Sequence, residues 1–230
     1  MSNKRLNHFQ GPLNAAQIAD GMNTASRNAK RLADDAILLL DNGRWPSAVS
    51  LAILSIEESG KSSILRRLAV ATDPKDLKEI WREYRSHTKK NSMGVLVDHV
   101  ASGARKLGDF APLFDADAEH PHLLDQLKQL GFYSDCLGNA HWAEPAKVID
   151  EATAKSIVAT AKVLSSDKEI QALEIELWIQ HVGPSLNASQ ADAERSLERW
   201  YVALQQHGLA PKGNNAMSEF IHSGIGAADA

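Results

Sequence analysis

The stretch Ser55-Ile-Glu-Glu-Ser-Gly-Lys61 places two acids and a lysine in the middle of an otherwise apolar helical segment. This segment begins at Trp45-Pro46, because proline is well tolerated in the first turn of a helix, and it continues to about Val70. Between residues 49 and 56, apolar side chains cover almost the whole circumference of the helix. Such a pattern is typical of the central helix of a bundle. We therefore predict that the rest of the chain packs around this segment.

Helical periodicity continues on both sides of the central segment. Apolar residues spaced by three and four predict a helix over about residues 13–40, ended by Asn42-Gly43. Asp73-Pro74 predicts the start of a third helix, which we expect to reach about Asn91. Residues 108–122 and 131–145 predict loops on either side of a short helix over 123–130, and Asp150 predicts the cap of a helix that reaches about residue 165.

The chain changes character after residue 165. Two amphipathic helices are predicted over residues 170–181 and 191–207, the second capped by Asn187 or Ser189, and the Gly-, Asn- and Ala-rich last twenty residues are expected to fray. No segment alternates strictly between apolar and polar residues, and we find no hairpin signal. The predicted fold is therefore all-α: a helical bundle over residues 12–165 and a C-terminal helical extension with a loose tail over 166–230.

The composition limits the classes of protein to which the chain could belong. The 230 residues are 43% hydrophobic and 23% charged, as in ordinary globular proteins, and the net charge of −4 argues against extensive coating of nucleic acid. A single cysteine, Cys136, excludes an internal disulfide framework and a zinc site with several thiolates. The polar N-terminus has no secretory signal, and the longest apolar run, residues 36–40, is too short for a membrane span. We expect a cytoplasmic protein.

The third predicted helix carries the residues best suited to chemistry. Lys78, Arg82, Arg85 and Lys89 share one stripe, and His87 lies on the adjacent stripe. Such cations neutralise phosphate oxygens, and histidine exchanges protons near neutral pH. A solvated helix face would show the same pattern. The spacing Arg82-x4-His87 arises about once by chance in a chain of this composition, and on a straight helix the two side chains lie about 140° apart.

The central helix supplies the context for this segment. Glu57 precedes Lys61 by one turn, the favourable order for an ion pair between residues i and i+4. Glu58 aligns with Leu51, Leu54 and Leu65, which predicts that its carboxylate points into the bundle toward a cation of the third helix. Gly60 would allow that helix to approach closely.

Together these segments resemble the AbiV-type branch of the HEPN superfamily over about residues 13–165. The resemblance is carried by five motifs: Asn28-Ala-x-x-Leu32-x-x-Asp-Ala36, Trp45-x-x-Ala48, Ile56-Glu-Glu-Ser-Gly-Lys61, Arg85-x-His87-x-x-Lys90 and Phe132-Tyr133-Ser-Asp135 with Trp142-x-x-Pro145. HEPN domains are antiparallel helical bundles and are commonly dimeric. Many are metal-independent endoribonucleases with an Arg-x4–6-His motif, whereas others are non-catalytic, and AbiV-type members act in abortive infection of bacteria by phage.

The resemblance assigns roles to individual residues. Arg82 and His87 match the catalytic motif, with His87 activating the ribose 2′-hydroxyl or protonating the leaving oxygen. The remaining assignments are RNA binding for Arg85, Lys89 and Lys90, support of the site for Glu57, Glu58 and Lys61, and a loop over the cleft carrying Tyr133 and Trp142. Glu83 departs from the family, where Asn, Asp or His often follows the arginine. No cofactor and no metal is expected.

The resemblance also implies partners. We expect a homodimer that acts on tRNA, mRNA or rRNA, or on translation, after a phage-encoded protein triggers it, without any membrane. Two alternatives stay open: a non-catalytic interaction module whose polar residues fix helix packing, and an antitoxin-like adaptor that binds a protein through residues 166–230. Glu119-His-Pro-His122 is better explained as a solvated turn than as a metal site, since no third ligand has suitable spacing.

Overall fold

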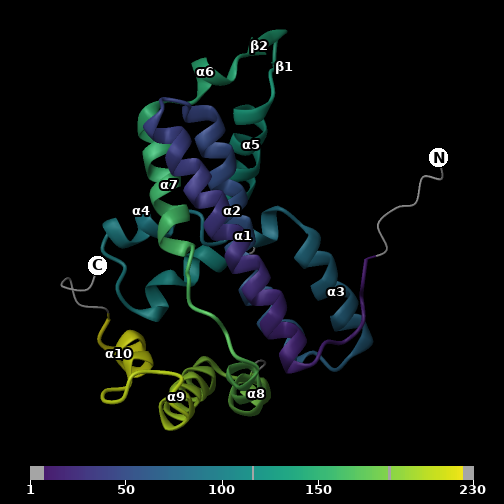
Figure 1. The fold of residues 1–230 in the computed structure, drawn as a ribbon, viewed down its shortest axis with the longest axis vertical. Coiled ribbons are helices and arrows are strands. Elements are labelled where there is room, and N and C mark those ends of the chain that lie inside the picture. Colours follow the sequence, from purple (N-terminus) through teal and green to yellow (C-terminus); the bar gives the residue numbers. More distant parts are fainter. Residues whose placement is uncertain (1–7, 116, 186–187, 225–230) are drawn as a thin grey trace.

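The computed structural model describes residues 8–115, 117–185 and 188–224, and in these residues the protein is a helical bundle (Figure 1). Helices α1 (Ala15–Asp41) and α2 (Trp45–Val70) form a long antiparallel pair. Helices α5 (His120–Phe132) and α7 (Glu151–Leu164) pack along α2. The predicted all-α class and the predicted bounds of the central helix are thus confirmed.

The main core explains why α2 is apolar on nearly every side: other helices surround it. Its residues Val49, Ala52 and Ile53 are completely buried among side chains of α1, α5 and α7. The facing surfaces of α1 and α7 include four buried alanines, Ala33, Ala36, Ala154 and Ala161, which let these helices approach α2 closely. Asp150 caps α7 as predicted, with its side chain accepting a hydrogen bond from the Thr153 amide.

Helix α3 (Pro74–Arg85) is shorter than predicted. Asp73 caps its start as expected, but the helix ends at Arg85, and the chain continues as a 3-10 turn, η1 (Thr88–Lys90). The close contact between η1 and α2 explains the early end. A Cβ atom on Gly60 would lie 2.1 Å from the Lys90 carbonyl oxygen, so α2 admits the Lys90 backbone only because residue 60 is glycine. His87 consequently lies outside α3, on the turn.

The segments between η1 and α7 are more ordered than the predicted loops. Helices α4 (Leu96–Ala101) and η2 (Leu107–Phe114) lead to α5, which extends to Phe132. A small antiparallel hairpin of β1 (Asp135–Leu137) and β2 (His141–Ala143) follows, then α6 (Pro145–Val148). Gly138 and Ala140 both adopt positive φ in the connecting turn. The prediction of no hairpin was wrong because each strand has only three residues, too few to show alternation.

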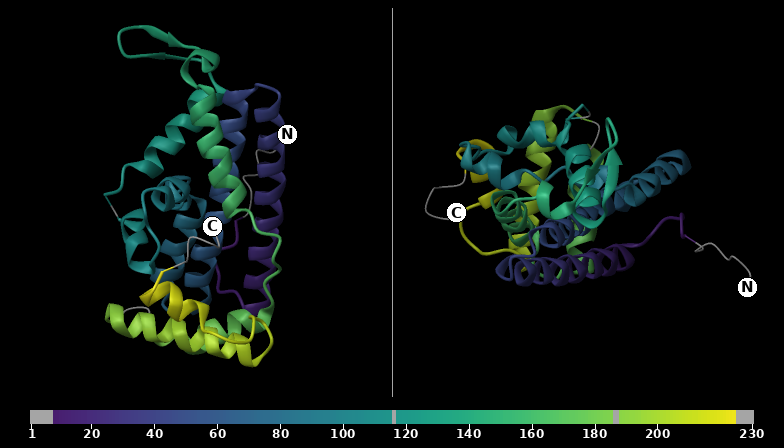
Figure 2. Two further views of the ribbon diagram at one scale, coloured as in Figure 1. Left: turned by 90° about the vertical axis from the view of Figure 1, so that its left-hand side faces the viewer. Right: turned by 90° about the horizontal axis from the view of Figure 1, so that it is seen from above.

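The C-terminal helices lie across one end of the bundle (Figures 1 and 2). They are α8 (Ala172–His181), η3 (Gly183–Ser185), α9 (Gln190–Gln206) and α10 (Ala216–His222). Ser189 caps α9, whereas Asn187 lies outside the described residues. The expectation that the last twenty residues fray was wrong for α10, which Asn215 caps. Residues 225–230 lie outside the described part.

Helix α8 links this end of the protein to the bundle. Ile175 is buried with Ile18 and Leu65 in a second core cluster, while Trp200 and its neighbours from α8 and α9 form a third. The boundary at residue 165 remains a prediction. Within the described ranges, no helix combines the length and apolarity needed to cross a membrane.

Candidate active site

A buried carboxylate, Glu57 of α2, is the centre of the candidate site. Its Oε1 accepts a hydrogen bond of 2.6 Å from Lys128 Nζ, and its Oε2 lies 2.7 Å from His87 Nδ1. Lys90 Nζ lies 3.8 Å from Oε2. Only 3% of the Glu57 side chain is exposed. Burial of an isolated carboxylate is unfavourable, so these donors from α5 and η1 are what allow Glu57 to stay inside the bundle.

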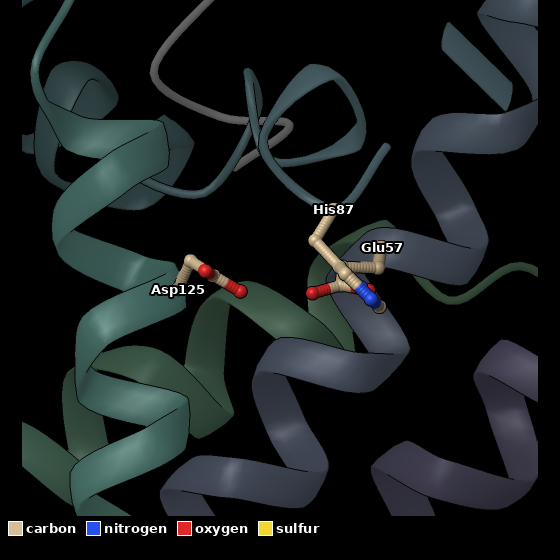
Figure 3. Close-up of side chains that lie close together, drawn as sticks. All are labelled: Glu57, His87 and Asp125. Carbon is tan, nitrogen blue, oxygen red and sulfur yellow. The ribbon is translucent and has the colours of Figure 1, made fainter. Parts of the chain in front are cut away.

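His87 is held by Glu57 in one orientation. An ionised carboxylate only accepts hydrogen bonds, so the ring must carry its proton on Nδ1 and donate it to Glu57. This leaves Nε2, the other ring nitrogen, for a proton transfer. The His87 side chain is 58% exposed while Glu57 is buried, so the pair has a fixed inner end and an accessible outer end. Figure 3 shows the two side chains next to each other. A carboxylate that orients a histidine is a common arrangement in acid–base catalysis.

The sequence prediction chose the wrong glutamate. Glu58, expected to point inward, instead pairs with Lys61 at 2.6 Å at the edge of the bundle, and the expected Glu57–Lys61 pair is absent. Lys61 Nζ also lies 5.3 Å from the centre of the Tyr84 ring. The cause is the helix face: Glu57 follows Val49 and Ile53 at intervals of four, and both are fully buried. Two of the three leucines with which Glu58 was aligned, Leu51 and Leu54, are only partly buried.

Two residues of α5 complete the cluster, and sequence reasoning missed both. Lys128 is buried, and its Nζ lies 2.8 Å from Asp125 Oδ1 as well as 2.6 Å from Glu57 Oε1. The spacing of Leu124, Lys128 and Gly131 on one helix face, all buried, was the signal that could have revealed the lysine.

The two buried lysines differ in how their charge is supported. Burial by itself lowers the pKa of Lys128, but contacts with Asp125 and Glu57 raise it above the usual value. Burial lowers the pKa of Lys90 below the usual value, since Glu57 compensates only in part and Lys61 and Lys128 repel its charge. Lys128 is therefore the principal counter-ion of Glu57.

The donor set also has to be considered as a metal site. Glu57, His87 and Asp125 bring one ligand atom each within 4.8 Å of one another (Figure 3), and carboxylate and imidazole groups are common metal ligands. However, the Lys128 ammonium contacts both carboxylates. A metal ion would have to displace this ammonium, so the arrangement is complete with a cation that the chain itself provides.

The other predicted site residues lie apart from this cluster. Arg82 is 76% exposed on α3 and pairs with Glu79. Arg85 donates hydrogen bonds to the carbonyl oxygens of Phe9 and Trp81, so its guanidinium fixes the N-terminal segment. Lys89 is exposed beside two cavities.

Tyr133 and Trp142, predicted to cover the cleft, are 62% and 71% exposed on the hairpin and its approach. The hairpin projects beyond the end of the bundle at which α1 and α2 are joined (Figure 1). Their role as a lip over the site stays a prediction.

Comparison with known proteins places the chain in one family. A family model named HEPN_AbiV, described as AbiV, matches residues 17–166. This range contains nearly all of α1, all of α2 to α7, and every residue of the Glu57 cluster. No curated protein and no solved structure is significantly similar to the chain.

Proposed function

Because the chain belongs to the AbiV family of HEPN proteins, we propose that it is an abortive-infection effector that cleaves RNA, with His87 transferring the proton. Family membership suggests an abortive-infection function of the HEPN type, and RNA cleavage is the step we add. The observation that carries it is the 2.7 Å contact between buried Glu57 Oε2 and His87 Nδ1, which leaves Nε2 accessible.

The proposed reaction needs no cofactor. His87 Nε2 accepts the proton of a ribose 2′-hydroxyl, whose oxygen attacks the adjacent phosphorus. The bond from phosphorus to the 5′-oxygen breaks, and that oxygen takes up a proton from water and leaves as a hydroxyl, so the products are a cyclic 2′,3′-phosphate and a free 5′ end. In the alternative role, His87 Nε2 donates its proton to the leaving oxygen, while water takes the proton of the 2′-hydroxyl. Glu57 holds the ring by Nδ1, and its carboxylate lies beside the positive charge that the ring carries after it has accepted the proton.

Arg82 is the proposed source of positive charge at the phosphate. Its pair with Glu79 lies on the surface, where such pairs contribute only about 0–1 kcal/mol. The guanidinium can therefore leave Glu79 for a phosphate, either in the same chain or across a homodimer. Exposed Lys89 follows His87 on the same turn and could contact the RNA backbone. Arg85 donates two of its five N–H groups to backbone carbonyl oxygens, and its remaining N–H groups stay candidates for contact with the RNA backbone.

The test replaces His87 by glutamine, which keeps a donor near Glu57 but cannot exchange protons. We expect RNA cleavage by the purified protein to fall about 10²- to 10⁴-fold, measured on gels with labelled RNA, and growth arrest on induction to disappear. His141→Gln on exposed β2 is the matched control and should retain cleavage. Cleavage that survives in His87→Gln would exclude His87 as the acid or base. A wild type that arrests growth with intact RNA would favour the non-catalytic interaction module.

A chelator should leave this cleavage unchanged. The Lys128 ammonium already contacts Glu57 and Asp125, so the reaction is expected to proceed in EDTA and to gain nothing from Mg²⁺, Mn²⁺ or Zn²⁺. Cleavage rates with EDTA and with each added ion measure this directly. Loss of cleavage in EDTA, restored by one of the ions, would instead assign Glu57, His87 and Asp125 to a metal site.

A further inference from the structure

Asp125 of α5 is the second carboxylate of the Glu57 cluster, and it is more accessible than the first. Its side chain is 33% exposed, whereas that of Glu57 is 3% exposed. Its Oδ1 atom is buried and lies 2.8 Å from Lys128 Nζ. The oxygen of Asp125 that can reach a substrate is therefore Oδ2.

The position of this carboxylate is fixed by Lys128. The buried ammonium lies 2.6 Å from Glu57 Oε1 and 2.8 Å from Asp125 Oδ1, so one cation joins the two acids. One oxygen of each acid and one ring nitrogen of His87 lie within 4.8 Å of one another. Figure 3 shows the Asp125 side chain reaching from α5 toward Glu57 and His87. Asp125 and His87 are thus two accessible groups beside one buried pair of charges.

The proposed cleavage of RNA requires two proton transfers. The 2′-hydroxyl loses a proton as its oxygen attacks the phosphorus, and the 5′-oxygen gains a proton as it leaves. In an in-line reaction these two oxygens lie on opposite sides of the phosphorus, so His87 Nε2 can serve only one of them. Glu57 cannot serve the other, because it is buried and its two oxygens are occupied by Lys128 and His87.

Asp125 is suited to the transfer that His87 leaves open. A proton-transfer group acts over about 2.6–3.2 Å, so two groups within 4.8 Å of each other can contact the same phosphodiester. An ionised carboxylate accepts a proton and has none to donate, whereas a protonated imidazole can donate one. The chemistry of the two groups therefore makes the carboxylate the base and the imidazole the acid.

We propose that Asp125 is the general base of RNA cleavage and that His87 is the general acid. Asp125 Oδ2 takes the proton of the 2′-hydroxyl while the 2′-oxygen forms its bond to phosphorus. The bond from phosphorus to the 5′-oxygen breaks, and His87 Nε2 gives its proton to that oxygen. Asp125 ends protonated and His87 neutral, and exchange with water restores both. This inference rests on the proposed function, and it gives His87 the role of acid, with Asp125 in the place of water as the base.

The first test replaces Asp125 by asparagine in the full-length chain. The amide keeps the shape of the side chain and an oxygen for Lys128, but it does not accept the proton. We expect RNA cleavage by the purified protein to fall about 10²- to 10⁴-fold. Glu119→Gln is the matched control, because this exposed acid at the start of the same helix makes no capping hydrogen bond. Its cleavage rate should equal that of the wild type.

An RNA with sulfur in place of the 5′-bridging oxygen separates the two roles. A thiolate is a weaker base than an alkoxide and leaves without receiving a proton, so the general acid is no longer needed, whereas the general base still is. On this substrate His87→Gln should recover most of its lost rate, and Asp125→Asn should stay about 10²- to 10⁴-fold slower than wild type. If Asp125 served only to position Lys128, and through it Glu57 and His87, its loss would impair the acid and the sulfur would rescue both variants.

A second variant tests the same role without relying on the asparagine. Asp125→Ala leaves space for a small carboxylate, so added formate should restore part of the cleavage, and the same concentration of chloride should not. Normal cleavage by Asp125→Asn, its rescue by the sulfur substrate, or no response of folded Asp125→Ala to formate would overturn Asp125 as the base. None of these results would affect the assignment of His87, which its own substitution tests. A wild type that leaves RNA intact would overturn the proposed function and this inference together.

Discussion

Gly60→Ala is expected to destabilise the protein by about 2 kcal/mol, although alanine is the better helix former. The added Cβ would lie 2.1 Å from the Lys90 carbonyl oxygen and 3.1 Å from the Lys90 Cα, so η1 would have to move away from α2. Overpacking of this kind costs about 1–3 kcal/mol, and a backbone contact this short belongs at the upper end. The higher helix propensity of alanine offsets up to about 1 kcal/mol of this loss in stability. In a chain of this size, the melting temperature should fall by roughly 4–8 °C.

Gly21→Ala is the matched control for this experiment. Gly21 also lies inside a long helix, α1, but a Cβ there would meet only Leu65 side-chain carbons at 3.5 and 3.9 Å. Its substitution should therefore stabilise the protein by up to about 1 kcal/mol. If the contact between η1 and α2 is as close as described, thermal unfolding should show a lower melting temperature for Gly60→Ala and a higher one for Gly21→Ala. A Gly60→Ala variant as stable as Gly21→Ala would contradict that contact.

The parts of the fold that the sequence predicts well are those in which local chemistry and packing agree. The α2 segment is apolar on nearly all sides and has proline at its start, so burial and local propensity give the same bounds. Asp73 and Asp150 cap α3 and α7 through backbone amides a few residues away, which makes both visible in sequence. The end of α3 is different. It depends on Gly60, more than twenty residues earlier, and nothing in residues 86–91 signals it.

The site could be predicted only in outline. The sequence indicates that acids of α2 meet cations near His87, and Lys90 and His87 do lie beside an acid of α2. The choice between Glu57 and Glu58 depended on a difference of about 100° in helix phase, and alignment with Leu51 and Leu54, which are only partly buried, gave the wrong answer. Lys128 is distant in sequence, and its helix lies in a segment with little other signal. The part of the site that could not be predicted is therefore the pairing of charges between residues that are far apart in sequence.

Glu57→Gln is the substitution expected to have the largest effect on stability. It keeps the shape of the side chain but removes the charge that Lys128 and Lys90 face, so Lys128 would keep only Asp125 and Lys90 would lose its ion-pair partner. Breaking a buried ion pair from one side costs about 3–5 kcal/mol. We expect the free energy of unfolding, measured with urea, to fall by roughly 3 kcal/mol or more, and RNA cleavage to fall as well because His87 loses its orienting carboxylate.

The adjacent acid provides the control, and a second substitution tests the cause. Glu58→Gln disrupts only the partly buried pair with Lys61, whose side chains are 17% and 18% exposed, and it should cost less than Glu57→Gln does. Adding Lys128→Met to Glu57→Gln removes the stranded ammonium, so the double variant should recover much of the lost stability, because an apolar replacement of a buried pair is often neutral. Two outcomes would show that Glu57 is not the buried centre of the site. One is that the stability losses of Glu57→Gln and Lys128→Met add in the double variant, and the other is that Glu58→Gln lowers the free energy of unfolding more than Glu57→Gln does.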